Sequence, residues 1–304
     1  MKKQANSWKE IRKMSTNKYP DFSVVMSVYK SDKADYFRQS IESIINQTVL
    51  PTEIILVLDG PVENEILTII NSKIELLKGK IKINVISLKD NVGLGRALNI
   101  AVSHCNCEWI ARMDSDDISI PDRFKLQLEY IVKNPDVDVL GGGIVEFIDT
   151  LDKTVGYRNV PLDNAQIIAF MKKRCPFNHV TVFLNKKSLI RAGNYLHCPY
   201  NEDYYLWIRM ALKKCRFANL REVLVMVRVG NDMYERRGGK DYFDSEIKIQ
   251  QFMLKSNVID NLQYYYNVVI RFIVQRVMPN NIRGIAFRVF ARERCSKYSH
   301  RTML

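Results

Sequence analysis

Several sequence patterns that assign a protein to a ligand or a compartment are missing from this chain. Its six cysteines include no C-x-x-C pair and follow no regular spacing, which argues against a disulfide framework and favours a reducing compartment. No GK[ST] sequence is present, so P-loop ATPase chemistry has no support. The G-x-G-x-x-G pattern of dinucleotide binding starts at Gly93 but breaks at Leu98.

Long hydrophobic runs are also missing. The most membrane-like stretch, residues 264–279, is interrupted by Arg271 and Arg276 and falls short of the ~20 mostly apolar residues that a spanning helix needs. The basic N-terminal segment lacks the apolar core of a secretory signal. We therefore expect no transmembrane segment and no export signal.

Positive charge, in contrast, is in excess. Lys and Arg total 46 against 33 acidic residues, a net charge of +13. Such a protein is drawn to polyanions: nucleic acid, an anionic membrane surface or phosphorylated substrates. Charge alone does not choose among them, and the 47% hydrophobic composition of the 304 residues is ample for a buried core.

The pattern of apolar residues predicts an α/β fold. From Phe22, the β-branched runs FSVVMSV, EIILVLD, KINVIS and EWIARM alternate with segments that have apolar residues at helical spacing. This rhythm is typical of a mostly parallel sheet flanked by helices on both faces. After Pro121, a helix through Phe124, Leu128 and Ile131 leads into more isolated strands of a mixed region.

Ligands of such sheets bind beyond the carboxyl ends of the strands, where loops converge. Asp114, Asp116 and Asp117 follow the run EWIARM at one such end. A single Asp there is a good cap or turn former, whereas three repel one another unless a cation or donors compensate. A calcium loop of the EF-hand kind is excluded, because its sixth and twelfth positions hold Ser119 and Lys125. The cluster predicts Mg²⁺ or Mn²⁺, completed by substrate phosphates.

Three further features each have two interpretations. Glu202 and Asp203 open a helical pattern, either as favourable partners of the helix dipole or as a general base. Arg96, near a predicted helix start, either meets a phosphate or lies in solvent. Arg236 and Arg237 precede paired glycines and form either a basic loop that closes over phosphates or a solvated turn.

The chain resembles the family 2 glycosyltransferases, and among them bacterial enzymes that build O-antigen or capsular polysaccharide. The resemblance covers roughly residues 21–240 and lies in the order of six motifs: FSVVMSVYKSD, QSIESIINQTVLPTEIILVLDG, NVGLGRALNIA, EWIARMDSDDISIPDRF, NHVTVFL and NEDYYLWIRM. It implies a GT-A fold, an inverting mechanism, Mn²⁺ or Mg²⁺ as cofactor, and a nucleotide-sugar donor. We expect a UDP-sugar, with galactose or glucose favoured.

On the donor side, the resemblance assigns roles to the strand ends. Tyr29, together with Ser27 at the end of the first strand, lines the nucleotide site. Asp59 matches the aspartate that accepts a hydrogen bond from the base, usually uracil. Asp114 and Asp116 match the D-x-D pair that binds the metal, with Asp116 nearest the ion and Asp114 facing the nucleotide sugar.

On the acceptor side, Asp203 matches the catalytic base, with Glu202 beside it in the pair. A lone histidine such as His179 belongs to the core by default, but the family often places one near the donor diphosphate or the acceptor. The expected nucleotide-sugar-binding residues therefore also include one histidine and three arginines: His179, Arg96, Arg236 and Arg237.

The C-terminal region and the partners follow from the same resemblance. After residue 258 aromatic residues alternate with arginines, which suits an interfacial helix on anionic lipid or a nucleic-acid surface. The resembling enzymes act on a polyprenyl-diphosphate-linked saccharide at the cytoplasmic leaflet. We therefore expect a cytoplasmic protein, peripheral at the inner leaflet of the plasma membrane, with an anionic membrane surface and no nucleic acid among its partners.

We expect four segments along the chain: a basic N-terminal arm (1–20), a nucleotide-sugar-binding half (21–120), a half for the acceptor and the catalytic base (121–231), and a basic aromatic C-terminal region (232–304). Two rival interpretations remain. One is a basic RNA-binding protein, favoured by the net charge. The other is a sugar-nucleotide pyrophosphorylase, which shares the nucleotide-binding layout but usually has a Gly-rich loop that SVYKSDK lacks.

Overall fold

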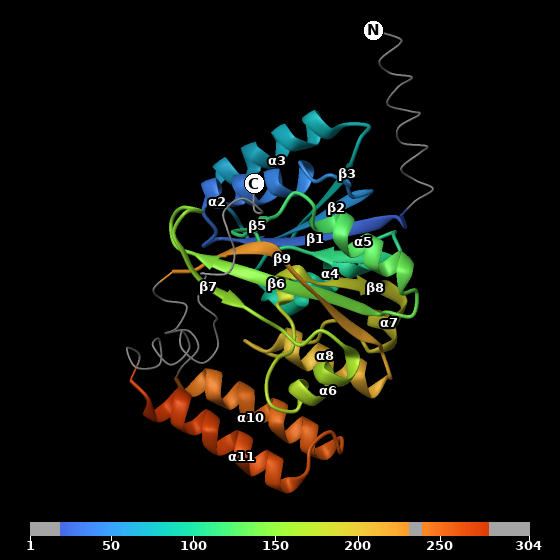
Figure 1. The fold of residues 1–304 in the computed structure, drawn as a ribbon. Helices are drawn as coiled ribbons and strands as arrows, with labels where there is room; N and C mark the ends of the chain where they lie inside the picture. The colour runs from blue at the N-terminus through green and yellow to red at the C-terminus, as the bar shows by residue number, and fades with distance from the viewer. Residues whose placement is uncertain (1–18, 231–238, 280–304) are drawn as a thin grey trace.

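A single sheet passes through the centre of the molecule (Figure 1). The computed structural model describes residues 19–230 and 239–279. Within them the sheet has nine strands in the order β3-β2-β1-β4-β8-β6-β9-β5, with β7 paired to β6. The strands are β1 (Phe22–Tyr29), β2 (Glu53–Asp59), β3 (Lys82–Ser87), β4 (Trp109–Arg112), β5 (Ile118–Ser119), β6 (Val139–Phe147), β7 (Thr154–Arg158), β8 (Phe183–Asn185) and β9 (Phe217–Arg228).

The predicted α/β class and the parallel core of the sheet are confirmed. Strands β3, β2, β1 and β4 are mutually parallel, as βαβ connections require. The strands predicted after Pro121 are mixed in direction but not isolated, since they continue the same sheet. Strand β8 runs antiparallel to both β4 and β6, while β6 and β9 are parallel.

Helices cover both faces because side chains alternate along each strand. Val24 and Met26 of β1 pack with α2, α3 and α5 on one face, whereas Val25 packs with α4, α6, α7, α8 and α10 on the other. The helices are α2 (Ala34–Ile45), α3 (Asn64–Leu77), α4 (Leu94–His104), α5 (Arg123–Lys133), α6 (Asn164–Met171), α7 (Lys186–Arg191), α8 (Glu202–Leu212), α10 (Lys240–Lys255) and α11 (Asn261–Phe272), with a 3₁₀ turn η1 (His179–Thr181) and a π-helical turn η2 (Ile273–Val277).

Helices α10 and α11 form an outer layer beneath α8 (Figure 1). A polar contact attaches this layer to the start of α8: Asn201 donates to the Ser245 hydroxyl at 3.1 Å. None of the helices in residues 19–230 and 239–279 combines the length and the apolarity needed to cross a membrane. Of the cysteines within those ranges, all are free thiols, and Cys105, Cys107 and Cys215 are buried.

Three consecutive glycines, Gly141 to Gly143, form the middle of β6, where its pairing with β9 shifts register. A Cβ on Gly141 would stand 2.3 Å from Asn219 Oδ1 and 2.7 Å from Phe177 Cδ1. Asn219 is itself held in place, because its amide donates to the carbonyl of Pro161 at 2.7 Å. The glycines therefore leave room for side chains that arrive from β9 and from the segment before η1.

Gly141→Ala is expected to lower the free energy of unfolding by about 1–3 kcal/mol, because overpacking forces neighbours out of their rotamers. Urea denaturation measures the change. Val155→Ala on the exposed surface of β7 is the control and should stay within about 0.5 kcal/mol. A Gly141→Ala protein as stable as the wild type would contradict this prediction, because it would mean that the side chains of Asn219 and Phe177 move aside at no cost in free energy.

Candidate functional site

The candidate site lies where β1, β2 and β4 end. The parallel register places Tyr29 beside Asp59, and the loop after Arg112 passes the end of β1, where the Ser115 hydroxyl donates to Asp32 at 2.7 Å. Tyr29 is exposed and Ser27 is partly buried. The strand ends predicted to converge therefore do converge, at the edge where ligands of such sheets bind.

Asp59 is a buried carboxylate at the end of β2. Its two oxygens accept hydrogen bonds from the backbone N–H groups of Val92 at 2.7 Å and Gly93 at 3.0 Å. Gly93 is the N-cap of α4 and has a φ of 86°, a left-handed conformation that favours glycine. Asp59 thus fixes the loop that leads into α4, and its predicted contact with a base must share these oxygens.

Four carboxylates meet beyond β4. Asp114, Asp116 and Asp117 come from the loop, and Asp32 comes from the turn after β1, where its carboxylate accepts the Tyr29 N–H at 3.0 Å. Asp114 and Asp32 both raise the pKa of Asp116, so the four side chains share one electrostatic environment. Asp32 was not among the predicted site residues.

Arg112 is the buried counter-charge of this cluster. Its guanidinium pairs through both terminal nitrogens with the Asp114 carboxylate, and the side chain is 3% exposed. Behind it, the fully buried Arg123 donates to the Arg112 carbonyl at 2.8 Å. Burial, and then the charge of Arg112, lower the pKa of Arg123 to about 9. One face of Asp114 is therefore committed to Arg112.

Arg228, at the end of β9, holds the loop in place. Its backbone N–H donates to Asp117 Oδ1 at 2.8 Å, and its Nε donates to the Asp116 carbonyl at 3.2 Å. The guanidinium also stacks on Tyr36, 3.9 Å from the ring centre. Arg228 thereby connects the acidic loop with α2 and with β9.

The acidic loop carries more negative charge than its protein neighbours neutralise. Burial, together with the charges of Asp114 and Asp32, raises the pKa of Asp116 to about 6. Burial and the charge of Asp116 raise the pKa of Asp117 well above its ordinary value. Such crowding fits a divalent cation as the compensating charge.

The donor set also limits which kind of cation site fits. Within residues 19–230 and 239–279 no three acidic, histidine or cysteine side chains are arranged to ligate a metal by themselves. An ion that takes one or two carboxylates and completes its shell with water and ligand phosphates fits this arrangement. Asp116, with Asp114, can hold Mg²⁺ or Mn²⁺ in that way.

A second acidic pair opens α8. Asp203 Oδ1 accepts the Tyr204 N–H at 2.7 Å, and the thiol of Cys175 lies 3.4 Å from Asp203 Oδ2. Burial and the charge of Asp203 raise the pKa of Glu202 to about 7, and the charges of Arg112 and Asp114 also act on it. The start of α8 therefore lies within electrostatic range of Arg112 and Asp114.

His179 and Tyr195 lie between the two acidic groups. His179 Nε2 is 2.8 Å from the Tyr195 hydroxyl, and the imidazole packs edge-on against Trp207. Burial, and then the charge of Arg112, hold the pKa of His179 well below its ordinary value. The imidazole is therefore neutral at physiological pH, with one nitrogen committed to Tyr195.

Close packing between α4 and α8 brings the second pair near. A Cβ on Gly95 would stand 3.2 Å from the Cβ of Glu202 and 3.2 Å from the carbonyl oxygen of Leu196. Asn99, one turn further along α4, donates to the Tyr195 carbonyl at 2.7 Å. Gly95 is thus a point of close helix approach, although the sequence pattern around it resembled a nucleotide fingerprint.

The predicted site residues within the described ranges fall into three groups. Asp59, Asp114 and Asp116 lie at the strand ends with Tyr29 and Ser27. Glu202 and Asp203 lie at the start of α8, which packs against α4, and His179 lies in η1 beside Tyr195 and Trp207. Arg96 is exposed on α4, while Arg236 and Arg237 lie outside the described residues.

Five residues that were not predicted from the sequence lie next to the predicted site residues and support them. These are Asp32, Arg112, Arg123, Tyr195 and Arg228. A buried arginine directly before an acidic cluster, as in ARMDSDD, is a signal for a counter-charge that could have been used. Arg228 and Tyr195 carried no local signal, because only the tertiary fold brings them to the acidic loop and to His179.

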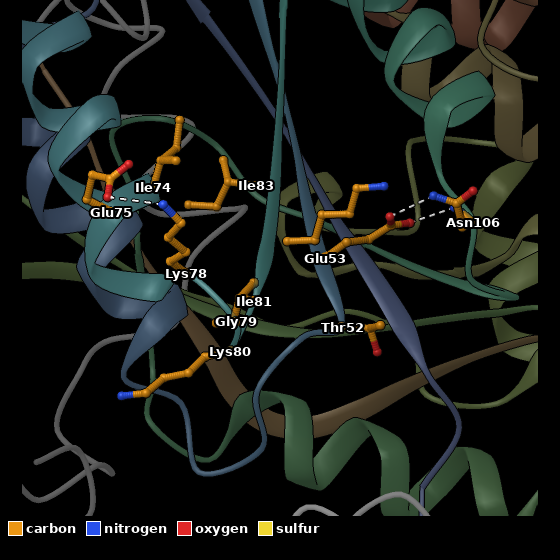
Figure 2. Close-up of a pocket in the computed structure, with 11 residues that line it drawn as sticks. Thr52, Glu53, Ile74, Glu75, Lys78, Gly79, Lys80, Ile81, Ile83 and Asn106 are labelled. Carbon is orange, nitrogen blue, oxygen red and sulfur yellow. Dashed lines mark hydrogen bonds and ion pairs between the residues drawn. The ribbon is translucent and has the colours of Figure 1, made fainter. Parts of the chain in front are cut away.

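An open pocket of about 760 Å³ lies elsewhere, at the amino ends of β2 and β3. Figure 2 shows Glu53 paired with Asn106 and Lys78 paired with Glu75 in its wall. Glu53 accepts bonds from the Ser23 hydroxyl at 2.7 Å and from the Asn106 N–H at 2.6 Å. The buried Glu53 carboxylate therefore already has its hydrogen-bond partners. The pocket lies at the amino ends of the strands, whereas the acidic cluster lies at their carboxyl ends.

The family model described as Glycosyl transferase family 2 matches residues 23–193 of the chain. A relative from Escherichia coli, named UDP-Gal:alpha-D-GlcNAc-diphosphoundecaprenol beta-1,3-galactosyltransferase, is 35% identical over 270 residues. The match covers 88% of this chain and 96% of the relative.

Solved structures have the same fold at low identity. The S. aureus protein TarS 1-349, crystallised with UDP-GlcNAc, superposes with a TM-score of 0.62 at 17% identity, over 90% of this chain and 82% of that one. The mannosyltransferase PcManGT from Pyrobaculum calidifontis, solved with GDP-Man and Mn²⁺, gives a TM-score of 0.57 at 13% identity, over 90% and 81%. The predicted GT-A fold is confirmed by these neighbours.

Asp116→Asn is expected to stabilise the metal-free protein, since it removes an ion that burial and neighbouring charges oppose. The pKa of about 6 against an ordinary 3.8 means that the penalty is absent below pH 3.8 and complete above pH 6. At about 1.4 kcal/mol per pKa unit, we expect a gain of about 1–3 kcal/mol at pH 8 and of less than about 1 kcal/mol at pH 4.

Urea denaturation with chelator present, at both pH values, measures this gain. Asp90→Asn, which alters an exposed carboxylate in the loop before α4, is the control and should change little at either pH. Equal stability of Asp116→Asn and wild type at pH 8 would contradict the inferred crowding of charge.

Proposed function

This chain belongs to glycosyl transferase family 2, and from that premise we propose that it is an inverting, metal-dependent enzyme. The reaction moves a hexose from a UDP-sugar to a polyprenyl-diphosphate-linked glycan in bacterial surface polysaccharide (O-antigen) synthesis. Residues 21–120 form the nucleotide-sugar half and residues 121–231 supply the acceptor side and the catalytic base.

One observation supports this proposal above the others. Two acidic groups lie near one another: Asp114 and Asp116 after β4, and Glu202 and Asp203 at the start of α8, where Glu202 packs against Gly95 of α4. Arg112, which pairs with Asp114, also lies within electrostatic range of Glu202, and this supports a single centre. Transfer between two substrates needs such a pair of separate acidic functions, one for the leaving group and one for the attacking hydroxyl.

On the donor side, Asp116 and Asp114 would hold the divalent ion. When bound, Mn²⁺ or Mg²⁺ supplies positive charge to the phosphate oxygens as negative charge develops on them. Arg112 holds the Asp114 carboxylate in a fixed orientation. Tyr29, Ser27 and Asp59 then line the nucleotide position, and the exposed Arg96 of α4 is available to a phosphate.

On the acceptor side, Asp203 takes the proton of the attacking hydroxyl. Burial raises its pKa, while the Tyr204 N–H and the Cys175 thiol oppose that rise. The raised pKa makes this carboxylate more basic than a solvated one, which suits a general base. The neutral His179, fixed by Tyr195, offers its remaining ring nitrogen to the substrates without adding charge.

The comparisons support the substrate class more firmly than the sugar. The Escherichia coli relative is named for UDP-Gal and a diphosphoundecaprenol acceptor, which favours galactose, or glucose as its epimer. The TarS and PcManGT structures hold UDP-GlcNAc and GDP-Man with Mn²⁺ respectively. Family membership also favours sugar transfer over the rival RNA-binding and pyrophosphorylase interpretations.

Transfer by the purified full chain tests the proposal. UDP-galactose, UDP-glucose, UDP-GlcNAc and GDP-mannose are offered with Mn²⁺ and a lipid-diphosphate GlcNAc acceptor, and the product is identified by mass spectrometry and its anomeric configuration by NMR. We expect a UDP-hexose product of inverted configuration, a loss of at least 100-fold in chelator, and recovery on addition of Mn²⁺. Undiminished transfer in chelator, or a retained configuration, would refute the proposed mechanism.

Asp203→Asn is expected to lower kcat by about 10²- to 10⁴-fold, the usual effect of losing a general base. UDP binding, measured by calorimetry with Mn²⁺, should stay within about twofold. Asp241→Asn is a matched control, because Asp241 is likewise the second residue of a helix but is exposed on α10. Near-normal turnover by Asp203→Asn would remove this residue from the role.

A further inference from the structure

Helix α11 has its polar residues inside and its apolar residues outside. Asn267 is 2% exposed and Gln275, in the π-helical turn that follows, is 8% exposed. Leu262, at the other extreme, is 81% exposed. A helix at the surface of a soluble domain normally has the reverse arrangement, with its apolar stripe on the core.

The inner face of α11 is held by polar contacts. The Asn267 amide donates to Gln250 of α10 at 2.7 Å and to the Lys172 carbonyl at 2.8 Å. Arg271 Nε donates to Glu246 at 2.6 Å, and both side chains are 10% exposed. These contacts of Asn267 and Arg271 hold α11 on α10 through its polar side, and the apolar face is left to point away from the protein.

The outer face is one continuous stripe. Its residues recur three, four, seven, eight, eleven and fifteen positions after the first, as on one side of a helix. The exposed members are Leu262, Tyr265, Tyr266, Val269, Ile270, Ile273 and Val277. An exposed apolar stripe of this extent marks an interaction surface.

We propose that this stripe docks on an anionic lipid surface and lies in the plane of the headgroups. Residues 261–277 extend roughly 25 Å at 1.5 Å per residue, and their inner side is polar, which suits a helix lying in the interface rather than crossing it. Tyr265 and Tyr266 have the amphipathic rings that favour this depth.

Charge at the rim of the stripe favours lipid over a second protein. Arg276 is exposed at its C-terminal end, and Lys172 and Lys173, whose carbonyls accept bonds from α11, are exposed beside it. The whole chain has a net charge of +13, so a dimer formed through this face would bring two chains of that charge together. An anionic surface attracts these cations instead.

The choice of lipid also rests on the proposed function, since the proposed acceptor is lipid-linked. Helix α10 connects the stripe to the catalytic side, because Ser245 of α10 accepts from Asn201 at 3.1 Å, directly before Glu202. Docking through α11 would therefore hold the start of α8 at a constant position relative to the membrane that carries the acceptor.

Sedimentation with vesicles tests the proposal. The full chain is mixed with vesicles of phosphatidylethanolamine and phosphatidylglycerol at 3:1, about a quarter anionic lipid, and with pure phosphatidylcholine. The test variant combines Val269→Ser with Val277→Ser. The control combines Leu76→Ser with Val132→Ser, which are similarly exposed apolar residues on α3 and α5.

We expect the wild type and the control to bind the anionic vesicles, and the test variant to partition at least tenfold less, with unchanged circular dichroism. Transfer by the test variant should fall at least tenfold for a vesicle-embedded acceptor and stay within twofold for a water-soluble one. Failure of every protein to transfer sugar would refute the proposed function, while the vesicle result would still decide the docking surface.

Three results would overturn the proposal. One is a test variant that binds vesicles like the wild type. Another is a wild-type dimer by light scattering that becomes monomeric in the test variant without lipid, which would make the stripe a protein interface. The third is vesicle binding that depends on residues 280–304 alone, which would make that segment the anchor.

Discussion

The candidate site depends on how the fold offsets the repulsion among the negative charges that crowd the end of β4. Asp32, Asp114, Asp116 and Asp117 share one environment, and the protein supplies one buried arginine, Arg112, directly against Asp114. That single pair neutralises part of the charge and leaves the rest to whatever binds. A fully compensated cluster would be more stable but would have no affinity for a cation, so the incomplete neutralisation is what makes the loop able to bind one.

The parts of the fold that local pattern determines could be predicted from sequence. The βαβ rhythm predicted the parallel strands, and the acidic motifs pointed to Asp114, Asp116 and Asp203 because their types and spacing are local properties. The contacts of Arg228 with the acidic loop and the bond between Tyr195 and His179 depend on tertiary neighbours. The same limit applies to α11: its basic and aromatic composition was visible, but which side faces the protein is decided by contacts with Gln250 and Glu246.

Close approach of α4 and α8 is the second constraint on the site. Gly95 has no side chain, so the start of α8 can come within van der Waals contact of α4, and Asn99 fixes the segment that carries Tyr195. This packing brings Glu202 and Asp203 within electrostatic reach of Arg112. The glycines of the NVGLG segment therefore serve helix packing and the turn at Gly93, and the resemblance to a dinucleotide fingerprint is accidental.

Arg228 makes the two halves of the sequence inseparable at the site. It is contributed by β9, yet it bonds the acidic loop of the first half and stacks on a ring of α2. A chimaera that joined the first half of this chain to the second half of a relative would keep the acidic loop in place only if the incoming strand ended in an arginine of the same reach. The position of the acidic loop in such hybrids is thus coupled to the second half through one side chain.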